Sequence, residues 1–252
     1  MRQILGRLQP KDNYSIVVSS DKTEWTTYFS PPLHLNPEKN FEIALVNLET
    51  YYAMPNITNE NNMFVYSPDN GTTYKRIDIP VGSYEIAQIN SAIQRQLEIN
   101  KDWSGTAHYI TLQPNFSTLC STINITNQQY KVDMTRSTVR KLLGFEQQVL
   151  DHGFHVSENP VDILSISSIL INCDIASGSY LNGRAEPIIY SFFPDVSPGY
   201  KIIETPHNLV YLPISRSGDI NQIRVWLTDQ NGVLLDNRGE TINIRLHIRQ
   251  CI

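Results

Sequence analysis

The chain ends on the stretch TINIRLHIRQCI, residues 241–252, in which apolar and polar side chains alternate. The apolar set is Ile242, Ile244, Leu246 and Ile248, and the polar set is Asn243, Arg245, His247 and Arg249. Because successive side chains of a β-strand point to opposite faces, this alternation predicts a strand with one face in the core. The four polar residues are then our candidate outer-face or intersubunit residues.

A turn signal lies just before this strand, at DQNG, residues 229–232. Asn-Gly between two strand-like runs is a strong hairpin signal, because glycine readily adopts the positive φ that a tight turn needs. We therefore expect residues 222–229 to pair with residues 233–236. The turn NRGE, residues 237–240, would then lead into the last strand.

Strand-like runs recur along the whole chain. They share β-branched and aromatic residues and are separated by turn residues or prolines. The runs cover residues 14–20, 25–30, 41–52, 63–66, 74–79, 108–112, 118–125, 130–134, 161–173, 187–193, 201–204 and 209–213. So many short strands predict an antiparallel all-β protein.

The segment 82–100 interrupts this pattern with helical spacing. Ile86, Ile89, Ile93 and Leu97 form one stripe, as expected for an amphipathic helix packed on a core. Ser83 is a suitable N-cap for this helix.

A shorter helix is predicted at residues 136–145. Ser137 or Thr138 would cap its N-terminus, and Gly144 stands where a left-handed glycine commonly ends a helix. This helix would also cover apolar core.

These elements predict an all-β fold, a single jelly-roll antiparallel sandwich with extra hairpins and two short helices. We find no internal repeat and no linker composition, so one jelly-roll domain is expected over residues 14–252. Residues 1–13 would precede it as an N-terminal arm. An immunoglobulin fold is disfavoured by the chain length and by the missing Cys…Trp…Cys framework.

Composition excludes several classes of protein. The net charge of the 252-residue chain is −5, and its clearest basic group, Arg136, Arg140 and Lys141, is expected to be a solvated helix face, so specific nucleic-acid binding is not expected. No 18-residue apolar run predicts a membrane span, and the start of the sequence does not resemble a signal peptide. Synthesis in a host cytoplasm or nucleus is therefore expected. The three cysteines, Cys120, Cys173 and Cys251, suit neither a metal site nor a disulfide framework.

Catalytic signatures are missing from the sequence. There is no G-x-S-x-G, no phosphate-binding glycine loop and no pair of carboxylates at a telling spacing. His152 and His155 lie three apart in a glycine-containing segment, which favours solvated loop histidines over metal ligands. We expect no enzyme, no catalytic or metal residues and no cofactor.

Several stretches together resemble the penton base proteins of Polinton/Maverick elements, adintovirus-like genomes and their virophage relatives. The resemblance covers residues 40–250 approximately. It rests on the order of three passages: IPVGSYEIAQINSAIQ, then HYITL with STINITNQQYKVDM and VRKLLGF, then PGYKIIE with LVYLPI and INQIRVWLTDQNGVLLDNRGETINIRLHIR.

The resemblance implies a structural protein of the virion capsid. Such a penton would form homopentamers at the fivefold vertices of an icosahedral shell made mostly of double-jelly-roll major capsid protein. It allows a vertex fibre as a further partner, and it implies no active site.

Two other functions compete with this interpretation. One is a trimeric jelly-roll binding module that serves as a spike or binds a receptor or glycan. The other is an enzyme on a cupin-type barrel, which would need a His/Glu metal cluster with H-x-H spacing, and the sequence has no such spacing.

Overall fold

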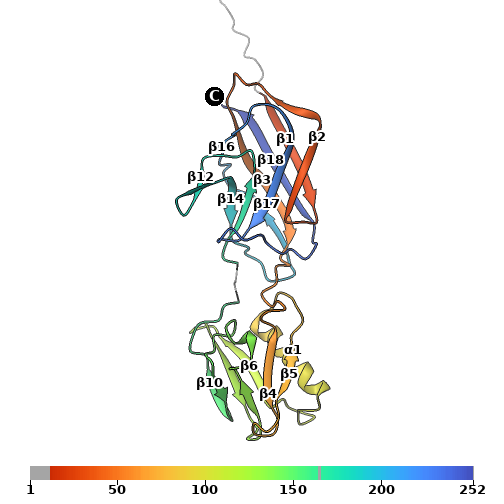
Figure 1. Ribbon diagram of the computed structural model, residues 1–252, viewed down its shortest axis with the longest axis vertical. Helices are drawn as coiled ribbons and strands as arrows, with labels where there is room; N and C mark the ends of the chain where they lie inside the picture. Colours follow the sequence, from red (N-terminus) through yellow and green to blue (C-terminus); the bar gives the residue numbers. More distant parts are fainter. Residues whose placement is uncertain (1–11, 164–165, 252) are drawn as a thin grey trace, which may run out of the picture. The chain divides into compact units, whose positions relative to one another are not determined.

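The computed structural model describes residues 12–163 and 166–251, which divide into two compact units (Figure 1). The first, here called the jelly-roll unit, takes the described residues up to Tyr52 and from Ile166 onward. The second, the inserted unit, runs from Ala53 to Ile163 among the described residues. Each unit is described by itself below.

The jelly-roll unit contains eight main strands. They are β1 (Asn13–Ser20), β2 (Glu24–Leu35), β3 (Phe41–Tyr51), β11 (Ile169–Cys173), β14 (Ile188–Phe192), β15 (Lys201–Glu204), β17 (Gly218–Thr228) and β18 (Ile242–Gln250). One sheet has the order β1-β18-β3-β15, and the other has the order β14-β11-β17-β2. Two packed sheets with these strand orders form an eight-stranded jelly roll, which confirms the predicted fold class.

Three short strands complete this unit. β16 (Leu212–Pro213) adds to β3, and β12 (Ser179–Leu181) pairs with β13 (Arg184–Glu186) as a separate hairpin. Residues 179–186 are in none of the strand-like runs found in the sequence, so this hairpin was not predicted.

The terminal strand β18 lies inside its sheet, between β1 and β3. Its apolar residues are all buried, as the alternation predicted: Ile242, Ile244, Leu246 and Ile248. A β-bulge shifts the register with β3, so that Ile244 lies opposite Leu48 and Leu246 lies opposite Leu45. The bulge places Leu45 and Leu48 both in the core although they are three residues apart in the sequence.

The inserted unit consists of two small sheets, one helix and one turn of 3₁₀ helix. Its elements are β4 (Met63–Ser67), β5 (Lys75–Asp78), α1 (Ile86–Ile99), β6 (Ile110–Asn115), β7 (Cys120–Ile125), β8 (Lys131–Asp133), η1 (Thr138–Arg140), β9 (Val149–Leu150) and β10 (Gly153–Val156). The sheet orders are β5-β4-β8-β9 and β10-β7-β6. The four apolar residues of the α1 stripe are buried in the core of this unit, as predicted.

From the sequence we expected one domain over residues 14–252, whereas the structure divides into two compact units. The segment between β3 and β11 builds a core of its own, with Phe64, Tyr66, Phe145 and many isoleucines and leucines at its centre. Most of the strands expected as extra hairpins therefore belong to the inserted unit. Of the expected arm, residues 1–11 lie outside the described residues, and Asn13 already pairs with Arg249 as part of β1.

The predicted cap of the long helix was wrong. Glu85 is the N-cap and forms a reciprocal capping box with Gln88, so α1 begins at Ile86. The hydroxyl of Ser83 instead donates to the carbonyl of Met54, which holds this segment to the start of the inserted unit.

The predicted second helix is only the short η1. Ser137 occupies the N-cap position, but its hydroxyl accepts the Val65 N–H (2.9 Å) and donates to the Asp133 carbonyl (2.7 Å). These tertiary hydrogen bonds replace helix capping. Gly144 has φ +80°, as predicted for a glycine that ends such a turn.

The DQNG turn forms, but the hairpin after it is short. The Asp229 N–H donates to the Val233 carbonyl (2.9 Å), and Asp229 Oδ1 accepts from Asn231 and Val233. Thr228 and Leu234 then form an isolated bridge, and residues 233–236 do not form a strand.

We predict that Ile244→Asp abolishes soluble folding, whereas Arg245→Asp leaves the fold intact. Ile244 is 1% exposed, so an aspartate there would bury a charge without a partner and cost more than about 4 kcal/mol. Arg245 is exposed, and its replacement should change the free energy of unfolding by less than about 0.5 kcal/mol. Soluble yield and urea unfolding measure both; a folded Ile244→Asp protein would contradict the assigned face.

Gly144→Ala should destabilise the inserted unit much more than Gly105→Ala. Both glycines have positive φ, +80° and +85°, so alanine costs about 1 kcal/mol at either position. Only at Gly144 would the new Cβ lie 2.1 Å from the Asn159 carbonyl oxygen, whereas nothing lies within 4 Å at Gly105. We expect a loss of at least roughly 3 kcal/mol for Gly144→Ala. Equal losses in thermal unfolding would argue against this close contact.

Candidate assembly surface

The four polar residues of β18 share the outer face of the first sheet. Asn243 lies opposite Ser19 and Glu49, and Arg245 lies opposite Val17 and Asn47. Asn243 and Arg245 are exposed, whereas His247 and Arg249 are half-buried. The burial separates the four residues into two pairs.

The His247 end of this face is held by side chains from two other segments. The Tyr211 hydroxyl and Nδ1 of His247 share a hydrogen bond of 2.6 Å. The guanidinium carbon of Arg249 lies 3.4 Å from the centre of the Tyr211 ring, and its Nε donates to Glu42 Oε1 (2.5 Å). The hydrogen bond to the Glu42 carboxylate raises the pKa of Arg249 above its ordinary value. These residues hold one another in place within one chain.

The Arg245 side of the face is open. Arg245 forms no ion pair with any residue in the described part of the chain. Val17 and Ile203, on β1 and β15, are each 63% exposed on the same sheet. Lys201 is already neutralised by Glu49 (Nζ–Oε2 2.6 Å), whose carboxylate raises the pKa of Lys201. An unpaired arginine with exposed aliphatic side chains nearby suits a contact with another subunit better than the paired residues do.

The alternation of side chains predicted the strand β18 but not the partners of its polar residues. Tyr211 is 36 residues from His247 in the sequence, and Glu42 is 207 residues from Arg249. No spacing rule connects such distant residues, since only the sheet order brings β3 and the segment around Tyr211 next to β18.

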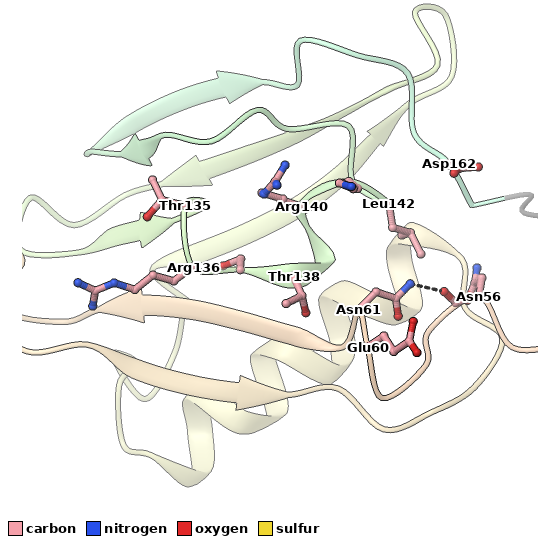
Figure 2. Close-up of a pocket in the computed structure, with 11 residues that line it drawn as sticks. Asn56, Glu60, Asn61, Thr135, Arg136, Thr138, Arg140, Leu142 and Asp162 are labelled. Carbon is pink, nitrogen blue, oxygen red and sulfur yellow. Dashed lines mark hydrogen bonds between the residues drawn. The ribbon is translucent and has the colours of Figure 1, made fainter.

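The inserted unit has a surface pocket of about 500 Å³ beside η1 (Figure 2). The basic group that was expected on a solvated helix face lines it. Arg136 is held over the Tyr74 ring, 4.4 Å from its centre, while Arg140 and Lys141 have no ion pair within the described segments. Glu60 and Asp162 also line the pocket, so it presents both signs of charge.

The candidate histidines His152 and His155 lie beside and within β10. His155 Nε2 is hydrogen-bonded to the Asp151 carbonyl (2.7 Å), and no group of three His, Cys, Asp or Glu residues in the described segments is placed to hold a metal ion. None of the helices within residues 12–163 and 166–251 is long and apolar enough to cross a bilayer.

The strand order and the two units define the class of protein as a single jelly roll with a unit inserted between β3 and β11, and jelly rolls are common in viral capsids. The structure of this chain is similar to the crystal structure of the selenomethionine-labelled mavirus penton protein. The alignment covers 96% of this chain and 100% of that one, with a TM-score of 0.53 and 12% sequence identity. The similarity confirms, at the level of the fold, the resemblance to penton proteins. No protein-family model and no curated protein matches the chain.

Tyr211→Phe should lower the free energy of unfolding by about 1 kcal/mol, because it removes the hydrogen bond to His247. The matched control is Tyr180→Phe, since Tyr180 is 72% exposed and its hydroxyl has no hydrogen-bond partner among the described residues. Urea unfolding of both variants checks this. An unchanged Tyr211→Phe protein would show that the His247 end is not held by this bond.

Proposed function

We propose that this protein is a viral capsid penton protein that forms homopentamers at the fivefold vertices of an icosahedral shell. The observation that carries the proposal is the similarity to a penton protein along 96% of the chain, which includes both units. A double-jelly-roll major capsid protein would surround the pentamer, and the outer end of the vertex could hold a fibre.

The open part of the outer face supports this proposal. In a fivefold ring, one patch of each subunit meets a different patch on the next, so the contact is heterologous. Arg245 and Asn243 are exposed, Arg245 forms no ion pair with another residue of the described segments, and Val17 adds apolar area next to them. We assign these residues to the subunit contact. His247 and Arg249 would instead hold the rim of the sheet, because their polar groups are engaged within the subunit.

Particle mass tests the proposal. Mass photometry and light scattering over a range of concentration and salt should find a particle of about five times 28.8 kDa. A trimer would contradict the proposal and favour the spike-like or glycan-binding module. A chain that remains monomeric after co-expression with the double-jelly-roll capsid protein of the same genome would also contradict it.

Arg245→Asp should weaken the pentamer by roughly tenfold or more in its dissociation constant, because it reverses a charge at the proposed contact. Arg95→Asp is the control, since Arg95 is exposed on α1 and forms no ion pair with another described residue. Circular dichroism verifies the fold of both. An Arg245→Asp protein that assembles like the parent would remove this residue from the contact.

A further inference from the structure

The jelly-roll unit has a surface pocket of about 440 Å³ on the outer face of the sheet β14-β11-β17-β2. On β17, Val225 and Leu227 are buried in the core, so Trp226 and Thr228, which alternate with them, point to the outer face. Asn172 of β11 lies opposite Trp226 and shares this face. The volume is within the usual range for sites that bind small ligands.

Two turns complete the wall of this pocket. The β12–β13 hairpin contributes Arg184 and Glu186 to the lining. The Ser179 hydroxyl donates to the Ile188 carbonyl and so ties the hairpin to β14. The DQNG turn contributes Asn231. Segments that are far apart in the sequence therefore surround one hollow in the sheet surface.

The floor of the pocket carries a polar side chain whose orientation is fixed. Asn172 is only 4% exposed. Its Nδ2 lies 3.2 or 3.3 Å from the carbonyl oxygens of Leu170 and Trp226 and from Thr228 Oγ1. Because carbonyl oxygens only accept hydrogen bonds, this end of the amide must be the NH₂ group, which places Oδ1 at the other end.

The oxygen of this amide is an unused acceptor. Asn172 Oδ1 accepts no hydrogen bond from any residue that the structure describes. It is not one of the fully enclosed unpaired atoms, and Asn172 lines the pocket, so Oδ1 is reached from the pocket. Polar atoms of such a buried side chain are normally paired, so this oxygen is available to a donor group of a bound molecule.

The rim of the pocket offers further unpaired polar groups. Arg184 and Glu186 are exposed, and neither forms an ion pair within residues 12–163 and 166–251. The Asn182 side chain, at the tip of the hairpin, has no hydrogen-bond partner in those segments either. A guanidinium only donates, a carboxylate only accepts, and a carboxamide does both. The rim therefore suits a ligand whose groups both donate and accept, as hydroxyls do.

Trp226 gives the pocket an aromatic wall. The guanidinium carbon of Arg224 lies 5.0 Å from the centre of its ring, and Arg224 is held by an ion pair with Glu24. Arg224 does not line the pocket, so a different part of the indole faces it. A sugar ring has C–H groups that pack against an aromatic side chain and hydroxyls around its edge that donate and accept hydrogen bonds.

We propose that this pocket binds a neutral sugar unit of a glycan. One hydroxyl would donate to Asn172 Oδ1 while C–H groups of the ring pack against Trp226. Other hydroxyls would bond to Arg184 and Glu186, whose opposite charges give the rim no net charge for an ionic ligand. This inference goes beyond the proposed function, because sugar binding by this pocket requires no particular oligomer.

Binding of the full chain to defined glycans tests the proposal. The protein is applied to an array of neutral and sialylated oligosaccharides, and the neutral glycan that is bound best is then titrated by calorimetry. The double variant Arg184→Ala/Glu186→Ala should weaken binding by roughly tenfold or more, since it removes two polar partners of the sugar. Both residues are exposed, so the unfolding midpoint should stay within a few degrees.

Tyr180→Ala is the matched control on the same hairpin. Tyr180 is 72% exposed and pairs with Ala185, and these two residues alternate with those that line the pocket. They therefore lie on the other face of the hairpin. Tyr180→Ala should leave glycan binding unchanged.

Asn172→Leu tests the floor of the pocket. It retains the approximate size of the side chain but removes the carboxamide oxygen, so affinity should fall by roughly tenfold or more in the folded protein. An array on which no neutral glycan is bound, or binding that the rim double variant retains, would overturn the proposal. Particle mass should be the same in all these variants, so a failure here is distinguishable from a failure of the pentamer.

Discussion

The jelly-roll unit depends on the insertion of its last strand between its first and third. β18 pairs with β1 on one side and β3 on the other, so the sheet is not continuous until residues 242–250 are in place. The four buried residues of β18 supply the apolar side of that strand. In this sheet β3 pairs with β18, β15 and β16, and none of these pairings requires that the chain run directly from β3 into β11. The sheet therefore tolerates a long insertion between β3 and β11.

The same strand explains what the sequence could and could not predict. Alternation over residues 242–248 is a local property, and burial of one face follows from it directly. The helical stripe of α1 was predictable for the same reason. The division into two units was not, since the inserted segment is as rich in strands as its surroundings and no linker composition marks Tyr52 or Ile166. The boundary between the two units depends on which residues share a hydrophobic core. The periodicity of apolar residues along the sequence does not show which strands share a core, so it does not predict this boundary.

The errors at helix and turn ends have a common cause. Ser83 and Ser137 are good N-cap residues by type, yet each hydroxyl bonds to a segment elsewhere in the fold. A hydroxyl that finds a tertiary partner does not need the helix terminus. On the outer face the limit is similar, because the orientation of Arg245 and His247 was predictable but the engagement of His247 by Tyr211 was not. Only the structure distinguishes a polar side chain that is free to bind a partner from one that is already hydrogen-bonded within the chain.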